Sequence, residues 1–260
     1  MAVSTRKQLV NKVLKKLRED TLTGAQTISD VPYAETIAEF INDVKEEVED
    51  AWNWTQLRNQ LSFTTVAGTS TYNLGNSSST NIAFTVIDSS NNVIVIDSVE
   101  GYDTEDASNE RTQILSMYNV TKDIEMTKKS DNYFNRQNKL VSTPQSESPM
   151  HYRISGMDSN GNIIVDLYPI PNGEYTIESW CYVPQDPLIT DASQLVLSCA
   201  ETAIVYGTWA MAISERGEDG GQLYDEVVRK YNDYLSTAIS RDRELKSSTD
   251  EGHEGDWMVV

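Results

Sequence analysis

The side chains that most often carry out catalysis are scarce in this sequence and stand apart from one another. The 260 residues include two histidines and two cysteines. His151 falls in a predicted strand and His253 near the C-terminal end, and neither stands in a nucleophile or metal-binding pattern. Cys181 and Cys199 have no spacing typical of a metal site or a disulfide framework, so we expect buried, reduced thiols.

Motifs that hold phosphates or metal ions are also missing. The sequence has no phosphate loop, no dinucleotide fingerprint and no zinc spacing. Residues 158–161 resemble the start of a calcium loop, but Pro169 occupies the position that requires a terminal Glu, so we interpret them as a turn. The sequence therefore predicts no catalytic residue, no cofactor and no metal. A Ser, His and Asp brought together only by the fold would not show in the sequence.

The chain is strongly acidic, with a formal charge of −19. Such a charge argues against a protein that grips nucleic-acid phosphates over a broad surface. The exception is the segment 1–20, which holds six Lys and Arg against two acids. This basic helix could balance the acidic body or meet an acidic partner. No segment is long and apolar enough to span a membrane, and the N-terminus lacks a signal-peptide core.

Helical periodicity predicts that helices lie at both ends of the chain. Thr5 to Gln8 fits a capping box at the start of the first helix, and Asp30 with Pro32 is typical of the start of the second. Two more helices are expected between about Asp191 and Lys246, joined by the three glycines of residues 216–221. The first of this pair carries a stripe of small residues that would allow close packing: Val196, Ala200, Ala203, Gly207 and Ala210.

The middle of the chain changes to the alternating pattern of strands at Leu61. We expect a hairpin over residues 63–74, a second over 82–99, and strands at 150–155, 163–168 and 175–183. Asn160-Gly161 favours a tight turn, and Pro169 to Gly173 form the next. Residues 111–142 are ambiguous, with a short helix expected near Ser116 to Met126. The fold class predicted is α+β, with the domains 1–57 and 191–246 as a helical bundle, 58–190 as an antiparallel β-rich insertion and 247–260 as an extended tail.

Several motifs follow one another in a recognisable order over nearly the whole chain. They are Trp52-Asn53-Trp54 after the helix pair, residues 63–74 (FTTVAGTSTYNL), 148–152 (SPMHY), 164–171 (IVDLYPIP) and 175–177 (YTI), then the Ala-rich helix and the final Tyr231 to Asp242 helix. In this order the sequence resembles the head-to-tail adaptor proteins of tailed bacteriophages, also called connector or tail tubular proteins. Residues 100–142 do not match the family pattern.

The resemblance implies a structural virion protein without catalysis. Such adaptors form a dodecameric ring that joins the portal to downstream tail or nozzle proteins and encloses a channel through which viral DNA passes without specific binding. The protein would be made in the host cytoplasm and would be located in the neck of the virion, with no membrane involved. In this setting Trp257, Met258, Val259 and Val260 would dock onto the portal, and the acidic side chains Glu39, Asp43 and Glu46 could line the channel.

Two other classes of protein stay open at this point. One is another tail component, such as a tail-tube or receptor-binding protein whose β region binds a host ligand. The other is a soluble carbohydrate-binding or hydrolytic protein, which would show a saturable pocket.

Overall fold

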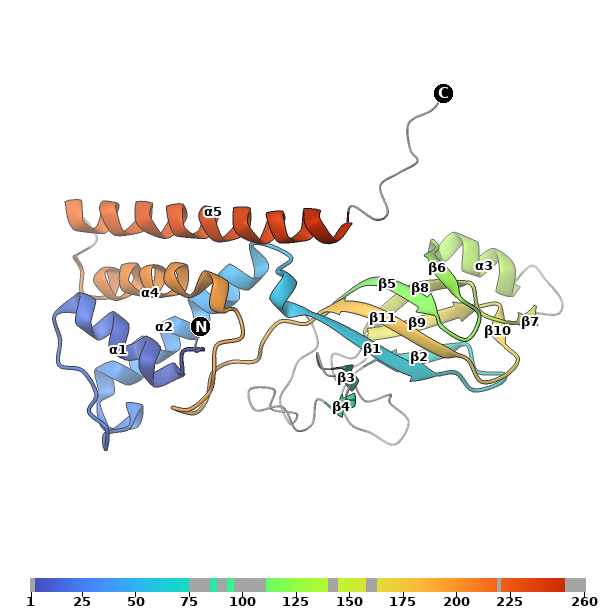
Figure 1. The fold of residues 1–260 in the computed structure, drawn as a ribbon, viewed down its shortest axis with the longest axis horizontal. Coiled ribbons are helices and arrows are strands. Elements are labelled where there is room, and N and C mark those ends of the chain that lie inside the picture. The colour runs from blue at the N-terminus through green and yellow to red at the C-terminus, as the bar shows by residue number, and fades with distance from the viewer. Residues whose placement is uncertain are drawn as a thin grey trace, which may run out of the picture. The chain divides into compact units, whose positions relative to one another are not determined.

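The chain divides into two compact units, each described here by itself. The computed structural model describes residues 3–74, 85–87, 93–95, 111–139, 145–157, 163–218 and 221–250. One unit joins Met1–Leu57 to Pro187–Val260, and the other is Arg58–Asp186. The first is helical and the second is built on a β-sheet, so the predicted mixture of helix and sheet is confirmed (Figure 1).

Helix α1, Arg6–Leu17, begins at the predicted capping box. The backbone N–H of Gln8 donates to Oγ1 of Thr5 at 3.3 Å, and the backbone N–H of Thr5 donates to Oε1 of Gln8 at 3.0 Å. Both donors would otherwise lack a partner in the first helical turn. The helix ends at Arg18, which adopts a left-handed conformation with φ of 61°.

Helix α2, Pro32–Asp50, begins with Pro32 as predicted, but Asp30 does not cap it. Val31 is the N-cap and offers no side-chain acceptor. Asp30 instead closes the preceding short 3-10 helix η1, Ile28–Asp30, where its carboxylate accepts from the backbone N–H of Thr27 at 2.6 Å. The prediction that Asp30 caps α2 is therefore wrong, because Asp30 belongs to η1 and Val31 lies between it and the first residue of α2.

Helix α4, Glu201–Glu215, begins about ten residues later than predicted, after the 3-10 helix η5, Ser198–Ala200. The prediction of helix from Asp191 is wrong, because residues 191–195 pair with the N-terminal segment instead. Gln194 forms a β-bridge with Thr5, and the carboxylate of Asp191 lies 3.3 Å from the backbone nitrogen of Ile28. These contacts use the backbone groups and the side chain that a helix start would need.

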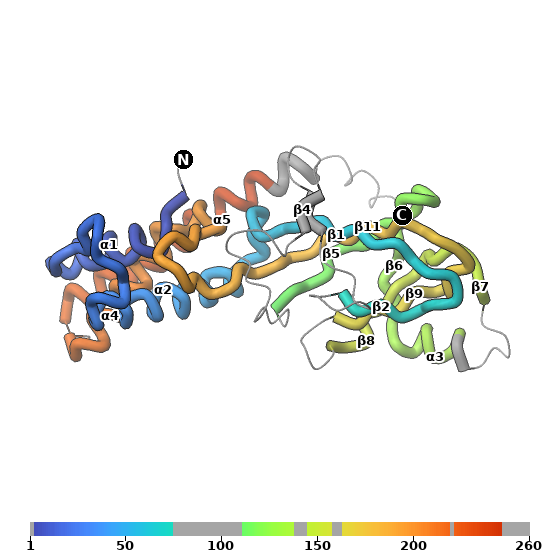
Figure 2. Tube along the Cα trace, turned by 90° about the horizontal axis from the view of Figure 1, so that it is seen from below, coloured from blue at the N-terminus to red at the C-terminus, as the bar shows by residue number. Residues whose placement is uncertain are grey.

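Helix α5, Gln222–Asp250, follows the glycine-rich reversal at the predicted place, where Gly217 has φ of 72°. Within the helical unit α4 is the central element, since it contacts α1, α2 and α5. Figure 1 shows α4 and α5 side by side, and Figure 2 shows α1, α2 and α4 gathered together. The 3-10 helix η2, Thr55–Leu57, contacts α5 near the end of the first segment of this unit.

The second unit is organised by a curled, seven-stranded sheet in which most neighbours run antiparallel (Figure 2). Its inner side carries a continuous apolar core that includes Phe63, Tyr152, Val165 and Ile177. The only parallel pairing between neighbours in this sheet is β6 with β8. The strands, in spatial order, are β1 (Arg58–Thr64), β11 (Thr176–Tyr182), β5 (Gln113–Asn119), β6 (Ile124–Lys128), β8 (His151–Met157), β9 (Ile163–Tyr168) and β2 (Thr71–Leu74).

The predicted hairpin over residues 63–74 is wrong in its pairing, although both strands exist. β1 pairs with β11 and β2 pairs with β9, so the two lie at opposite ends of the strand order. Gly68, at φ of 80°, still turns the chain between them, but its N–H donates to the carbonyl of Pro171 at 2.8 Å. The glycine in the local sequence thus predicted the turn correctly, whereas the partners of both strands are segments far away in the chain.

The described residues 111–139 hold two strands and a helix rather than the helix expected near Ser116 to Met126. β5 and β6 form an antiparallel pair there, and α3, Asp131–Lys139, follows them. Ile114, Met117 and Asn119 are buried, and a helix would not have placed them against β11. Tertiary pairing therefore overrides the local pattern.

The remaining strand predictions are largely confirmed. β8, β9 and β11 lie at the expected places, and β3 (Thr85–Ile87) pairs antiparallel with β4 (Val93–Val95). Within the turn expected at 169–173, β10 (Ile170–Pro171) pairs with β7 (Ser146–Glu147). Asn160-Gly161 and the outer parts of the second hairpin lie outside the described residues.

Candidate interaction surfaces

The three acidic residues predicted to line a channel all lie exposed on α2. Glu39, Asp43 and Glu46 recur at spacings of four and three, which places them along one side of the helix. The structure thus brings them together as a continuous negative stripe, which we call the α2 acidic stripe. That the stripe faces a channel stays a prediction.

One carboxylate of the acidic helix α2 is fully buried. Glu49 and Lys45 are both inaccessible to solvent, and their charged atoms lie 3.2 Å apart within one helical turn. A buried charge is stable only when it is paired or hydrogen-bonded, so the two side chains depend on each other. The sequence contained the signal, since Lys45 follows Ile41 by four residues and precedes Val48 by three, on the apolar side of the helix.

An open groove of about 400 Å³ lies between α2, α4 and α5. Phe40 and Val44 form one wall, and Tyr224, Val228 and Tyr231 form the other. Its floor is α4, contributed by Gly207, Ala210, Met211 and Ser214. The lining residues Phe40, Met211, Tyr224, Val228 and Tyr231 are partly exposed, whereas Val44, Gly207 and Ala210 are buried. Sequence reasoning identified the small-residue stripe that makes the floor but missed the groove.

A single hydrogen bond crosses this groove. The Tyr231 hydroxyl on α5 donates to Oε1 of Glu47 on α2 at 3.0 Å. Burial, and then the hydrogen bond to the Glu47 carboxylate, raise the pKa of Tyr231 above its usual range, so the phenol stays protonated as a donor. The groove therefore combines apolar walls with one negative group, the Glu47 carboxylate.

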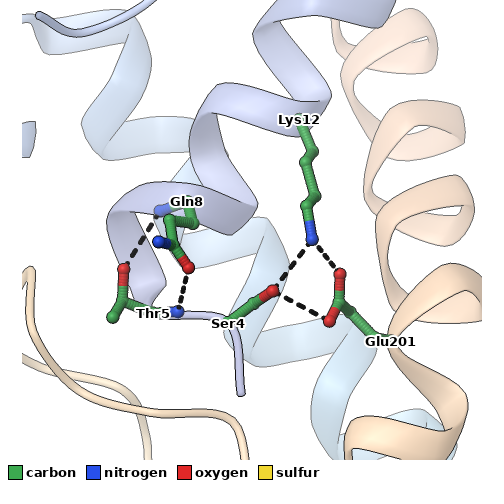
Figure 3. A network of polar contacts seen from close by, with 5 residues as sticks. All are labelled: Ser4, Thr5, Gln8, Lys12 and Glu201. Atoms are coloured by element: carbon green, nitrogen blue, oxygen red, sulfur yellow. Dashed lines mark hydrogen bonds and ion pairs between the residues drawn. The ribbon is translucent and has the colours of Figure 1, made fainter. Parts of the chain in front are cut away.

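Two basic residues of α1, Lys12 and Lys16, are engaged within their own unit. Lys12 forms an ion pair with Glu201 at the start of α4 and donates to the Ser4 hydroxyl at 2.8 Å, while Ser4 donates to Glu201 at 2.9 Å (Figure 3). Lys16 lies over the rings of Tyr206, at 3.8 Å from the centroid, and Trp209. These contacts join α1 to α4, so for Lys12 and Lys16 the charge-balancing interpretation is supported.

The last part of α5 is joined to the segment after α2 through a buried carboxylate. Asp242 accepts from Nε1 of Trp52 at 2.9 Å and from the backbone N–H of Thr55 at 3.1 Å. Arg243 lies over the Trp52 ring, 5.2 Å from its centroid. Trp54 is fully buried and donates to the carbonyl of Val48 at 2.7 Å. Both tryptophans thus pack within the helical unit.

Neither of the two cysteine thiols is activated as a nucleophile. Burial raises the pKa of the Cys181 thiol to about 11, and partial burial, with the nearby Asp242 carboxylate, raises that of Cys199 to about 11. Both thiols are therefore protonated near neutral pH, which is unlike a nucleophilic cysteine. Cys181 is buried as predicted, whereas Cys199 is exposed. Among the described residues, no three His, Cys, Asp or Glu side chains come together as a metal site.

Within the described part of the chain, none of the helices combines the length and the apolar composition required to cross a membrane. Trp257, Met258, Val259 and Val260, the predicted docking residues, lie outside the described residues.

The family model for the SU10 adaptor protein matches residues 4–252, which is nearly the whole chain. The chain belongs to the SU10 adaptor protein family. Comparison with curated proteins found no match. Membership of the SU10 adaptor family confirms the resemblance to phage head-to-tail adaptors and supports a structural role as a component of the phage virion. The match includes residues 100–142, which could not be aligned with the family pattern from the sequence motifs.

Proposed function

We propose that this protein forms a ring, of twelve copies, that joins the portal to the tail and encloses part of the DNA channel at the virion neck. The observation that carries the proposal is the family match across residues 4–252. The acidic body supports it, because a channel wall that repels phosphates lets DNA slide, whereas Lys and Arg contacts would hold DNA by counterion release.

In this proposal the α2 acidic stripe lines the channel. Glu39, Asp43 and Glu46 are exposed, and they present three charges on one side of a single helix. Repeated around a ring, such a stripe would form a continuous negative band. Passing DNA would then meet repulsion on all sides and would not adhere to any one subunit.

The division of labour along the chain is also part of the proposal. Residues 1–57 and 191–246 act as a helical bundle, and residues 58–190 act as a β-rich insertion that takes part, with the charged faces of the helices, in the contacts between subunits of the ring. The tail, residues 247–260, docks onto the portal through Trp257 to Val260. The composition supports this last assignment, since a Trp and three apolar residues follow a polar segment too poor in apolar side chains to fold alone.

Electron microscopy of the purified protein with portal-bearing capsids tests the proposal. We expect a ring of about a dozen subunits on the portal vertex. A portal mixed with an unrelated acidic protein of similar charge is the control for non-specific attachment. Capsids that stay bare at saturating protein concentration would overturn the proposal.

A further inference from the structure

The groove between α2, α4 and α5 is a docking surface whose occupant can be inferred from the same helical unit. Phe40, Met211, Tyr224 and Val228 leave part of their apolar surface open to solvent around it. Burying such surface stabilises an interface at roughly 25 cal/mol per Å². The negative Glu47 carboxylate among apolar walls favours a partner segment that pairs an apolar side chain with a positive one.

The C-terminal part of α5 presents this combination. Leu245 is 61 % exposed, although it continues the inner side of α5, on which Ala238 and Asp242 are almost fully buried. Arg241, which is also exposed, precedes Leu245 by four residues and so lies beside it on the helix surface. We call Arg241 and Leu245 the α5 knob.

We propose that the α5 knob of one copy enters the groove of the next copy, with Leu245 against the apolar walls and Arg241 facing Glu47. The knob and the groove complement each other, because each combines apolar surface with one charge and the two charges have opposite sign. The Glu47 carboxylate would then keep its hydrogen bond from Tyr231 and gain the guanidinium as a second partner.

The occupant cannot be the knob of the same copy. Leu245 lies about 21 to 32 Å further along α5 than Tyr231 and Tyr224, at 1.5 Å per residue of a continuous helix. Because α5 itself forms one wall of the groove, its other end cannot fold back into it. The contact therefore joins different surfaces of two copies, and this kind of contact generates a closed ring when the rotation between copies allows it.

The direction of the groove agrees with the proposed channel. At about 100° per residue, the groove-lining Phe40, Val44 and Glu47 lie roughly 100° around α2 from the stripe of Glu39, Asp43 and Glu46. In a ring, the direction to the neighbouring subunit and the direction to the channel differ by about a right angle. One orientation of α2 thus satisfies both roles.

Cross-linking between two different single-cysteine variants tests the contact directly. In a Cys199→Ser background, with Cys181 buried, one full-length variant carries Leu245→Cys and the other Ser214→Cys at the groove floor. After the two are mixed and assembled on portal-bearing capsids, a short bismaleimide should join them into a mixed dimer. Ile189→Cys, at an equally exposed apolar residue of the same unit, replaces Leu245→Cys in the control. Cross-linking of the control pair to the same extent, or no mixed dimer in intact rings, would overturn the contact.

Charge exchange gives an independent measurement. Arg241→Glu and Glu47→Arg should each weaken association between copies about tenfold or more, and the double variant should recover most of the loss. The matched control is Arg229→Glu, an exposed arginine of α5 away from the groove. Far-ultraviolet circular dichroism shows which variants fold.

The inference rests on the proposed ring only for its closure, and the two fail differently. Rings that form at wild-type strength with Arg241→Glu would refute the knob-and-groove contact and leave the adaptor function intact. Capsids that stay bare with the wild-type protein would instead refute the adaptor function, and association in free solution would still report on the contact.

Discussion

A methyl group added to Gly207 would lie 2.6 Å from Cγ1 of Val44, which is closer than two non-bonded carbon atoms approach in proteins. The same methyl group would lie 3.1 Å from the Tyr231 ring. α2 and α5 therefore both approach α4 closely at position 207, and a side chain there would force the helices apart.

Replacing Gly207 with Leu should destabilise the helical unit rather than only its assembly. Overpacking of this kind costs about 1–3 kcal/mol, so the unfolding midpoint in urea should fall. Gly24→Ala is the matched control, because nothing lies within 4 Å of a methyl group there. A Gly207→Leu protein that unfolds at the wild-type midpoint would show that the crossing is looser than described.

The packing at Gly207 shows which part of the fold the sequence could predict. The small-residue stripe, the capping box at Thr5 and the reversal at Gly217 are local features, and each appears where the sequence placed it. The pairing of β1 with β11, far away in the chain, was missed because short strands carry no information about their partner. The start of α4 was missed for the same reason, since residue 194 pairs with residue 5.

The candidate surfaces were predicted unevenly. The exposure of Glu39, Asp43 and Glu46 follows from helical spacing, and the structure agrees. The groove depends on how three helices diverge, which no single helix encodes. The burial of Glu49 was missed because an acidic residue in an acidic helix looks solvated until its partner, Lys45, is placed on the apolar side.

Glu49→Gln should lower the free energy of unfolding by about 1–3 kcal/mol, because the buried Lys45 ammonium would exchange a carboxylate partner for a neutral amide. The double variant Lys45→Met, Glu49→Leu should recover most of this loss, since packed apolar groups replace a buried pair well. Urea unfolding of the three proteins measures both effects. The control is Glu226→Gln. It breaks an exposed ion pair with Lys230, which has the same spacing of four residues along a helix, and it should change the stability little. A double variant as unstable as the single one would contradict this account.

The sheet unit should lose stability as the pH falls through about 6.5, the ordinary pKa of histidine, because of His151. Burial lowers the pKa of His151 in the folded protein, and the nearby Lys129 ammonium lowers it further. Its ring packs edge-on to Tyr133 of α3, with centroids 5.3 Å apart. With the folded pKa below the unfolded one, the unfolded chain binds the additional proton in this range, so acid favours unfolding.

The measurement is the urea midpoint of the wild type and of His151→Phe between about pH 7.5 and pH 5.5. The phenylalanine ring keeps the contact with Tyr133 but does not titrate, so the wild type should lose more stability than the variant over this range. Carboxylates that titrate elsewhere act equally on both proteins and cancel in the difference. Parallel pH profiles would assign the dependence to other groups.

Deleting Trp257 to Val260 should leave the unfolding midpoint unchanged and weaken attachment to the portal. A Trp in a desolvated pocket contributes at least ~2 kcal/mol to an interface, and a ring repeats the contact in every subunit. Co-sedimentation with portal-bearing capsids measures the attachment, and Trp257→Ala alone should give part of the loss. The control is a variant in which polar residues of the same tail are deleted and Trp257 to Val260 are kept. Attachment of the truncated protein at wild-type strength would remove the tail from the portal interface.

Reversing the α2 acidic stripe should make the ring bind DNA. Changing Glu39, Asp43 and Glu46 to Lys replaces repulsion by attraction at three exposed positions, so the fold should tolerate the change. Each new phosphate contact releases condensed counterions and steepens the fall of affinity with salt, by a slope of about 0.9 per contact on logarithmic axes. The control reverses the same number of charges on exposed residues of α4 and α5, Glu215, Asp225 and Asp233.

Two readouts separate the channel from the outer surface. Fluorescence anisotropy with a short duplex measures salt-dependent binding, and DNA ejection from assembled particles measures passage. If the stripe lines the channel, its reversal should slow ejection much more than the control reversal, since only charges facing the DNA path can retain it. Equal slowing by both variants, or normal ejection from particles whose rings carry the reversed stripe, would place Glu39, Asp43 and Glu46 away from the channel.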